Sequence, residues 1–263
     1  MTTYHEATSV TPLGEGKYAA RLAEEYSFGE AVNGGYLMGV LLRAAVAESP
    51  HAHPLTTAAS FLRPGQPGPA EIVVETRKTG RTAATSRVSL TQHGRPIVDA
   101  MVTTGTLDPA SEPAYQGARP AMPPVEECRP SGHDTSGFVA QVDMRFDPAV
   151  MGWLDGEPSG RPEMRAYFRL ADGADPDPYV LAIALDALVP VVANTGHTGW
   201  SPTVDLTWHL RALPAPGWLT VHGSGRLVRD GWNDEDVEIW DSAGTLVAQS
   251  RQLARTARAR TRK

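Results

Sequence analysis

The chain has 263 residues, of which 41% are hydrophobic, so it can bury a proper core as one large domain or two domains of ordinary size, and disorder along its whole length is excluded. A formal net charge of −6 at pH 7 argues against a nucleic-acid groove. A single cysteine excludes both an internal disulfide framework and a cysteine-rich zinc site, and the expected compartment is the reducing cytoplasm.

The first part of the chain is predicted to hold one strand, one helix and then a series of strands. No basic region followed by an apolar stretch begins the chain, so a signal peptide is not expected. A strand is predicted from Lys17 to Ala23 and a helix from Gly34 to Glu48, with Asn33 as the N-cap. Further strands should follow, with a His93-Gly94 turn between the last two, at residues 56–62, 70–79, 83–92 and 96–104.

Residues 106–134 are rich in Pro, Ser, Gly and Glu, a composition typical of a linker. Beyond it the same order of elements begins again with a strand-like segment at 138–146. A helix is predicted over 178–193; it is apolar on all sides, which indicates burial. This apolar run is too short for a bilayer and is interrupted by Asp186, so no membrane partner is expected. The last predicted strands lie at 236–240 and 245–254.

Two similar strings support an internal duplication. Ser60-Phe61-Leu62-Arg63-Pro64 and Trp208-His209-Leu210-Arg211-Ala212 both enter a turn rich in Pro or Gly. One helix followed by antiparallel strands suggests a sheet curled around that helix, and two such units could join edges into one sheet. The predicted fold class is α+β, a double hot-dog of two long helices, each wrapped by a curved antiparallel sheet. The predicted parts are a first domain, a linker, a second domain and a basic tail, at residues 1–107, 108–135, 136–256 and 257–263.

Several strings, in the same order along both halves, resemble the acyl-CoA thioesterase II family. They are Asn33-Gly34-Gly35-Tyr36-Leu37, Phe61-Leu62-Arg63-Pro64-Gly65, Asp186-Ala187-Leu188, Thr203-Val204-Asp205-Leu206-Thr207, and the segment from Asp241-Ser242-Ala243-Gly244 through Gln249-Ser250-Arg251-Gln252. The resemblance implies a double hot-dog fold and hydrolysis of acyl-CoA without a covalent intermediate and without a cofactor. It places the catalytic Asp, Thr and Gln of that family on Asp186, Thr203 and Gln252.

Asp186 lies inside the apolar run, where an ionised carboxylate without a partner would cost several kcal/mol. One interpretation is a structural aspartate bonded to backbone. The resemblance favours the other, a general base whose pKa is raised by burial and which takes a proton from water.

Thr203 and Gln252 are predicted to position that water, and their faces can be read from strand periodicity. Val204 and Leu206 belong to the apolar face of their strand, which puts Thr203 on the other face. Gln252 shares parity with Leu246, so Gln252 should face inward if Leu246 does. An ordinary strand threonine and a solvent-facing amide are the alternatives.

Gly34 and Gly35 are predicted to bind the oxyanion of the thioester. They open a helix, where free N–H groups and the positive end of the dipole point outward, and glycine lets a substrate approach the backbone closely. A Gly-Gly turn needed only for packing is an equal alternative. The helix start at 175–178 could serve instead, so the sequence leaves open which helix end faces Asp186.

Other chemistries have weaker support. Cys128 lies in the linker, which disfavours a thiol nucleophile, and the scattered histidines form no helical zinc spacing, so no metal is required. Hydration of enoyl thioesters would need a histidine where Val191 stands. A non-catalytic acyl-binding protein and a thioesterase for carrier-protein-bound acyl groups stay open as alternatives. Tyr36, Met38 and Trp208 are candidates for an acyl channel, and a homo-oligomer is expected.

Overall fold

The computed structural model describes residues 2–130, 136–197 and 199–256. Its α-helices are α1 (Tyr4–Ala7), α2 (Gly34–Ala47) and α3 (Pro178–Leu185). Its strands are β1 (Thr11–Gly14), β2 (Lys17–Leu22), β3 (Ser27–Phe28), β4 (Ala31–Val32), β5 (His53–Phe61), β6 (Gly68–Thr79), β7 (Ala83–Gln92), β8 (Arg95–Gly105), β9 (Arg129–Pro130), β10 (Val142–Phe146), β11 (Glu163–Leu170), β12 (Thr203–Leu210), β13 (Leu219–Ser224), β14 (Val228–Arg229), β15 (Trp232–Trp240) and β16 (Leu246–Arg255). Short 3₁₀ helices include η1 (Glu24–Tyr26), η2 (Val125–Glu127), η3 (Gly137–Gln141), η4 (Pro148–Val150) and η5 (Val191–Thr195).

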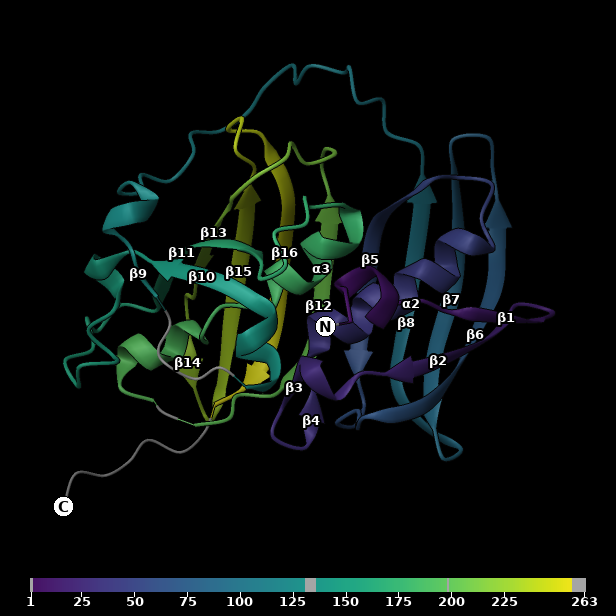
Figure 1. Cartoon of the computed structure of the whole chain (residues 1–263), viewed down its shortest axis with the longest axis horizontal. Helices are drawn as coiled ribbons and strands as arrows, with labels where there is room; N and C mark the ends of the chain where they lie inside the picture. The colour runs from purple at the N-terminus through teal and green to yellow at the C-terminus, as the bar shows by residue number, and fades with distance from the viewer. Residues whose placement is uncertain (1, 131–135, 198, 257–263) are drawn as a thin grey trace.

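One antiparallel sheet runs through both halves of the chain (Figure 1). Its strand order is β1-β2-β6-β7-β8-β5-β12-β16-β15-β13-β11-β10-β9, with β14 paired to β15. The halves meet where β5 pairs with β12, and Trp208 lies opposite Thr57. These two strands contain the similar strings that indicated a duplication. The prediction that two units join edges into one sheet is therefore confirmed.

Helix α2 packs on the sheet of the first half (Figure 1). Asn33 caps it as predicted, because its side-chain oxygen accepts a hydrogen bond from the Tyr36 amide at 2.8 Å. The helix is buried on almost every side, and Tyr36 and Met38 are fully enclosed. Tyr36 also stacks on Tyr26, with ring centroids 4.7 Å apart. The N-terminal half thus has one long helix against a curved sheet.

The second predicted helix is much shorter than expected, so the prediction of two long helices is wrong in this half. Helix α3 has eight residues and ends at Leu185, where the prediction continued to residue 193. Asp186 is its C-cap, with φ −116° and ψ 18°. Pro190 explains why the helix cannot continue to residue 193, since a proline disfavours helical geometry at the preceding residue and removes a backbone donor. A 3₁₀ turn, η5, takes the place of the remaining helix.

The segment from residue 106 to 124 contains no helix or strand and arches over the top of the molecule in Figure 1. It is fixed to the second half by side-chain hydrogen bonds. Gln116 donates to the carbonyl of Gly244 at 2.9 Å and accepts from the amide of Leu246 at 2.8 Å. The predicted basic tail at 257–263, and residues 131–135 of the predicted linker, lie outside the described residues. The domain boundaries stay a prediction.

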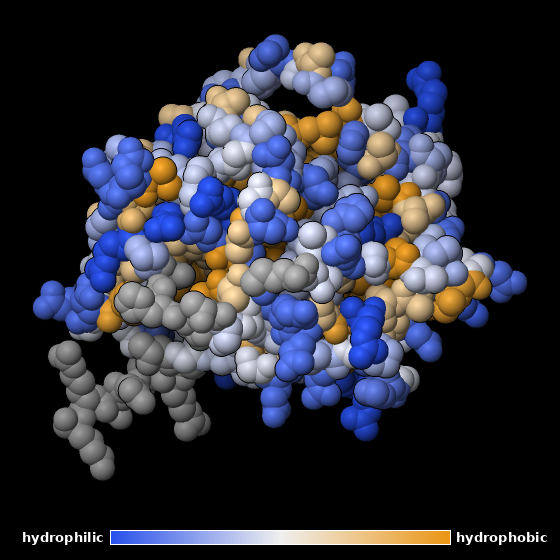
Figure 2. All heavy atoms as spheres, in the orientation of Figure 1, coloured by the Kyte–Doolittle hydropathy of each residue, from blue (hydrophilic) through white to orange (hydrophobic). Residues whose placement is uncertain are grey.

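The core lies between the sheet and the helices. It is a single cluster that includes side chains from α2, α3 and nearly every long strand. Figure 2 shows hydrophilic residues over most of one face, with hydrophobic residues in small areas between them, as is usual for a globular surface. None of the helices in the described ranges is long and apolar enough to cross a bilayer. The residues that matter most for chemistry are the polar ones inside this core.

Candidate active site

Asp186 lies where the two halves meet, at the end of α3 and beside the start of α2. Its Oδ2 atom accepts hydrogen bonds from Asn33 Nδ2 and from the Gly35 amide, each at 2.9 Å. Asn33 Nδ2 also donates to the backbone carbonyl of Asp186 at 3.1 Å. The carboxylate of one half is thus held by the helix start of the other, and the residue keeps partial exposure to solvent.

Burial raises the pKa of the Asp186 carboxyl from 3.8 to about 6, because desolvation disfavours the charged form. Hydrogen bonds from the amides of Gly35 and Gly34, and from the side chain of Asn33, act in the opposite direction and favour the carboxylate. The positive end of the α2 dipole adds to this effect. The balance leaves a carboxyl that is ionised at neutral pH and basic enough to accept a proton.

Gly34 and Gly35 allow the two helices to approach this closely. A Cβ atom at Gly35 would lie 2.5 Å from the carbonyl oxygen of Ala182 and 2.8 Å from the Cα of Ile183. The structure therefore identifies the start of α2 as the helix end that faces Asp186. Because the Gly35 N–H already donates to that carboxylate, oxyanion binding by the two glycines stays a prediction.

Thr203 lies on the inner face of the sheet, so the predicted outward orientation is wrong. The register between β12 and β16 shifts between Thr203 and Asp205, and this β-bulge places Thr203 opposite buried Ala254 while Val204 is exposed. Strict alternation would have put Thr203 on the outer face. A bulge inserts one extra residue and re-aims the side chains that precede it. Thr203 is thereby turned toward the core.

Gln252 faces inward, as predicted from the parity of its strand. Its neighbours on the same face, Ser250 and Ala254, are buried. Thr203 Oγ1 donates a hydrogen bond to Gln252 Oε1 at 2.7 Å. Two of the three predicted catalytic side chains are therefore in direct contact.

Glu235 is a second buried carboxyl in this site, and the sequence analysis missed it. It lies on β15, directly opposite Gln252 on β16, and only 2% of its surface is exposed. Its Oε2 atom accepts a hydrogen bond from the amide of Val191 at 3.0 Å. Burial raises its pKa from 4.5 to about 7; the negative charge of Asp186 adds to the rise, while hydrogen bonds from the Val191 amide and the Gln252 side chain lower it.

A signal for Glu235 was present in the sequence. The strand alternates inward and outward residues, and Glu235 shares parity with Val237 and Ile239, both of which are buried. A charged residue on an apolar face is uncommon and needs partners. Thr203 is thus hydrogen-bonded to Gln252, Gln252 lies directly opposite Glu235 on the neighbouring strand, and the charge of Asp186 raises the pKa of Glu235.

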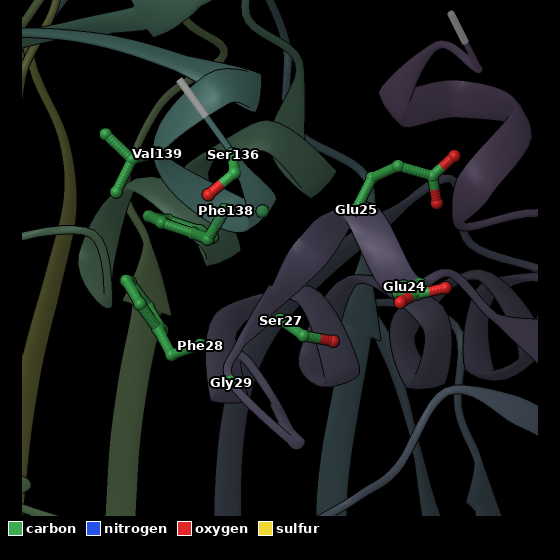
Figure 3. A pocket seen from close by; sticks show the side chains of 9 residues that line it. Glu24, Glu25, Ser27, Phe28, Gly29, Ser136, Phe138 and Val139 are labelled. Atoms are coloured by element: carbon green, nitrogen blue, oxygen red, sulfur yellow. The ribbon is translucent and has the colours of Figure 1, made fainter. Parts of the chain in front are cut away.

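A cavity of about 580 Å³ opens between residues 24–29 and residues 136–139 (Figure 3), and Asp186, Thr203 and Gln252 are not among the residues that line it. Aromatic and aliphatic side chains stand on one side of it in the picture and carboxylates on the other; the lining residues are Glu24, Glu25, Ser27, Phe28, Gly29, Ser136, Gly137, Phe138 and Val139. Tyr26, which adjoins this lining in the chain, accepts a hydrogen bond at its carbonyl from the Asn33 amide at 2.9 Å. The segment that forms one wall of the cavity is therefore linked, through Tyr26, to Asn33, which holds Asp186.

The other candidates from the sequence are buried side chains of the core or of the linker. The Tyr36 hydroxyl donates to the Ala7 carbonyl at 2.6 Å and accepts from the Ala23 amide at 3.0 Å. Trp208 is fully buried, and a place in an acyl channel stays a prediction for these side chains. Burial raises the pKa of the Cys128 thiol, which disfavours the thiolate. Among the described residues, no group of three or more potential ligands is arranged to hold a metal ion.

Comparisons with known proteins agree on one family. The acyl-CoA thioesterase N-terminal domain matches residues 22–105, and the acyl-CoA thioesterase C-terminal domain matches residues 116–256. A proposed thioesterase II from Thermobifida fusca is 46% identical, with a TM-score of 0.93 over 98% of both chains. A protein of unknown function with a hot dog fold from Alicyclobacillus acidocaldarius is 19% identical, with a TM-score of 0.86 over 97% of this chain and 98% of that one, which shows the fold alone. An uncharacterized protein of Mycobacterium tuberculosis is 33% identical over 261 residues, 90% of each chain. The chain therefore belongs to the acyl-CoA thioesterase family and has its hot-dog fold.

Proposed function

We propose that the protein hydrolyses acyl-CoA thioesters to the free acid and CoA, with Asp186 as the general base. Water adds its oxygen to the thioester carbon while Asp186 takes one of its protons. The tetrahedral intermediate then collapses and the carbon–sulfur bond breaks. The CoA sulfur leaves with its electron pair and takes the proton from Asp186. No covalent bond to the protein forms, and the chemistry of the step requires no cofactor.

The observation that carries this proposal is the environment of Asp186. The carboxyl is buried enough for its pKa to rise to about 6, and its residue still has partial access to solvent. Asn33 and Gly35 both donate to Oδ2, so neither of them occupies Oδ1. An oxygen without those donors can accept a hydrogen bond from water. A carboxylate held in this way is basic enough to take a proton from the water and fixes the direction from which that water attacks.

The surroundings of Asp186 suit the other parts of the reaction. Thr203 and Gln252, which are hydrogen-bonded to each other, would position the water. The cavity of Figure 3 would take part of the substrate. Glu24 and Glu25 on its lining would repel the phosphates of CoA, so we assign the cavity to the acyl or pantetheine part. A cytoplasmic homo-oligomer stays our expectation for the assembled protein.

The direct test is release of free thiol from a panel of acyl-CoA substrates from acetyl to palmitoyl. Turnover that varies with chain length would support the proposal and identify the preferred acyl group. The same acyl groups attached to a carrier protein are measured in parallel. Turnover of the carrier-bound forms alone would show that the substrate is an acyl group on a carrier protein. No turnover of either form would favour a protein that binds acyl groups without hydrolysing them.

The pH dependence follows from the raised pKa of Asp186. Only the ionised carboxylate can accept a proton, so kcat/KM should fall at least tenfold per pH unit as the pH drops below about 6. A carboxyl with an ordinary pKa would retain activity to about pH 4. The measurement is kcat/KM from pH 4.5 to 8.5, with circular dichroism at each pH to show that the protein stays folded. A kcat/KM that does not change between pH 4.5 and 6 would show that Asp186 is not the general base.

Thr203→Val should lower kcat by about tenfold to hundredfold, because valine has the shape of threonine but cannot donate to Gln252. Thr203→Ser keeps the hydroxyl and should retain most of the activity. Valine favours strands, so the melting temperature should not fall. Equal activity of the valine and serine variants would show that the Thr203 hydroxyl has no part in the reaction.

A further inference from the structure

We propose that Glu235 is a positioning residue of this active site, which sets the direction of the Gln252 amide and, through it, the direction of the Thr203 hydroxyl. This inference rests on the proposed hydrolysis. It adds a fourth side chain to the three predicted from the sequence. Glu235 would act on the reaction through its neighbours, without touching the substrate.

The position of Glu235 calls for an explanation. It lies on the inner face of β15, where the adjacent inward residue Val237 is 1% exposed. Its Oε1 atom lies 3.8 Å from the position that a Cβ atom would take at Gly223 on the neighbouring strand β13. A carboxyl group in such a place is held at a cost in stability that glutamine or leucine would avoid. A function for the carboxylate would account for that cost.

The polarity of the contacts shows what the carboxylate can do. An amide side chain can present either its oxygen or its nitrogen to a neighbour, whereas an ionised carboxylate can only accept. Glu235 therefore attracts the NH₂ group of Gln252, which lies directly opposite it on β16 and lowers its pKa. The Gln252 oxygen must then point the other way, toward Thr203. The 2.7 Å hydrogen bond from Thr203 Oγ1 to Gln252 Oε1 has this direction.

The same polarity orients the water. Because the Thr203 proton is donated to Gln252, the lone pairs of the Thr203 oxygen are left to accept a hydrogen bond from water. A water that donates one proton to Thr203 has its other proton available to Asp186. Glu235 thus ensures that Thr203 acts as an acceptor, which leaves Asp186 as the destination of the second proton.

The charges around Glu235 make this arrangement depend on pH. Asp186 at the end of α3 and Asp234 on the same strand both raise the pKa of Glu235, while the elements on its other sides contribute the Val191 amide and the Gln252 side chain. Protonated Glu235 can donate a hydrogen bond as well as accept one, so it no longer dictates the direction of the amide. The Gln252 side chain should therefore report the titration of Glu235.

Glu235→Gln tests the proposal with almost no change in volume. The new side chain can still accept from the Val191 amide, but it then presents NH₂ to the NH₂ of Gln252. Gln252 must turn over, and Thr203 loses its acceptor. We expect kcat to fall about tenfold to hundredfold, with KM changed less than threefold. The melting temperature at pH 8 should be equal or higher, because a buried carboxylate has been removed.

Glu238→Gln is the matched control. Glu238 lies on the same strand, opposite Gln249 on β16, and their side chains are hydrogen-bonded at 3.4 Å on the outer face of the sheet. The substitution makes the same chemical change in the same pair of strands, away from the site. Wild-type kcat and KM are expected. An equal loss of kcat in Glu238→Gln and Glu235→Gln would indicate a general effect on the strands and overturn the proposal.

Exchange of the two side chains provides a rescue. In Glu235→Gln/Gln252→Glu, the amide at 235 donates to the carboxylate at 252, which again accepts from Thr203. At pH 8, where both carboxyl groups are ionised, kcat should recover at least tenfold over Glu235→Gln. A double variant no faster than the single variant would contradict a role through the direction of the amide.

A measurement without turnover separates this proposal from the proposed hydrolysis. The side-chain ¹⁵N–¹H signals of Gln252 are followed against pH in Asp186→Asn, so that Asp186 does not titrate, with and without Glu235→Gln. We expect a pH-dependent shift with a midpoint at or below 7, absent when Glu235 is replaced. If this shift is seen and the wild-type protein hydrolyses no thioester, the proposed hydrolysis is refuted while the influence of Glu235 on Gln252 stands. No shift, or full kcat in Glu235→Gln, would refute the role of Glu235.

Discussion

Replacing Asp186 by asparagine is expected to lower kcat for acyl-CoA hydrolysis by roughly 10²–10⁴-fold, the contribution of a positioned general base. Asparagine has the same shape, and its oxygen can accept the hydrogen bonds that Asn33 and Gly35 now donate to Oδ2. Its NH₂ group then stands at the position of Oδ1 and cannot take a proton from water. The variant should therefore bind substrate normally and fail in the chemical step.

The same variant should be at least as stable as the wild type at neutral pH. Asp186 has a folded-state pKa raised from 3.8 to about 6, which corresponds to about 3 kcal/mol. Between these two pH values the native protein keeps a proton that the unfolded chain has released, so stability falls as the pH rises from about 4 to about 6. Above pH 6 the loss is complete. Asparagine has no such dependence.

Thiol release and thermal unfolding at pH 5 and pH 7.5 test both expectations together. Asp205→Asn is the control, since Asp205 is an exposed carboxylate on the outer face of β12, close in sequence to Thr203. It should keep wild-type activity. An active Asp186→Asn would mean that another carboxylate is the base, and Glu235 would be the first candidate. A variant that is inactive because it is unfolded would show no cooperative transition.

Gly35→Ala should damage stability and activity together. The added Cβ would lie 2.5 Å from the Ala182 carbonyl oxygen and 2.9 Å from the Cβ of Asp186. Backbone atoms cannot rotate away, so α2 and α3 must separate and the hydrogen bond from the Gly35 amide to Asp186 lengthens. Overpacking of this kind costs about 1–3 kcal/mol. The melting temperature should fall by roughly 3–10 °C, and kcat should fall with it.

Whether Gly35→Ala lowers or raises the melting temperature distinguishes a tight helix crossing from a loose one. Alanine is a better helix former than glycine by about 1 kcal/mol, so a helix with free space at this position would become more stable. Gly117→Ala is the control, because a Cβ at Gly117 meets no atom within 4 Å. Differential scanning calorimetry of the two variants gives the comparison. A higher melting temperature for Gly35→Ala would show that the helices have room to spare at their crossing.

The regular elements of the first half could be predicted from the sequence because their signals are local. Asn33 starts α2 as its N-cap, and His93-Gly94 forms the turn between β7 and β8 with both residues at positive φ. For the contact between the halves, the sequence predicted only that the edges of two sheets join, and it did not identify β5 and β12 as the strands that pair. The register of this pairing depends on which side chains fit the common core, and a single sequence does not contain that information directly.

The errors have physical causes that a hydrophobic pattern does not record. The apolar run after Leu185 continues through η5, so periodicity alone extended α3 past the point at which Pro190 forces another geometry. The bulge near Thr203 reverses the faces of the residues before it, and strict alternation cannot represent an extra residue. Glu235 lies in none of the strings that resemble the family, although its inward orientation follows from the alternation of residues along its strand.

The shared construction of the site has a consequence for the newly made protein. Asn33 and Gly35 come from the first half of the chain and Asp186 from the second, with the linker synthesised between them. A chain in which only the first half has folded has no base at all. One in which the halves have not docked exposes Asp186 to bulk water, where its pKa is ordinary and nothing fixes its direction. Under the proposed mechanism, the base therefore acquires its raised pKa and its fixed direction only when the two halves dock, at the end of folding.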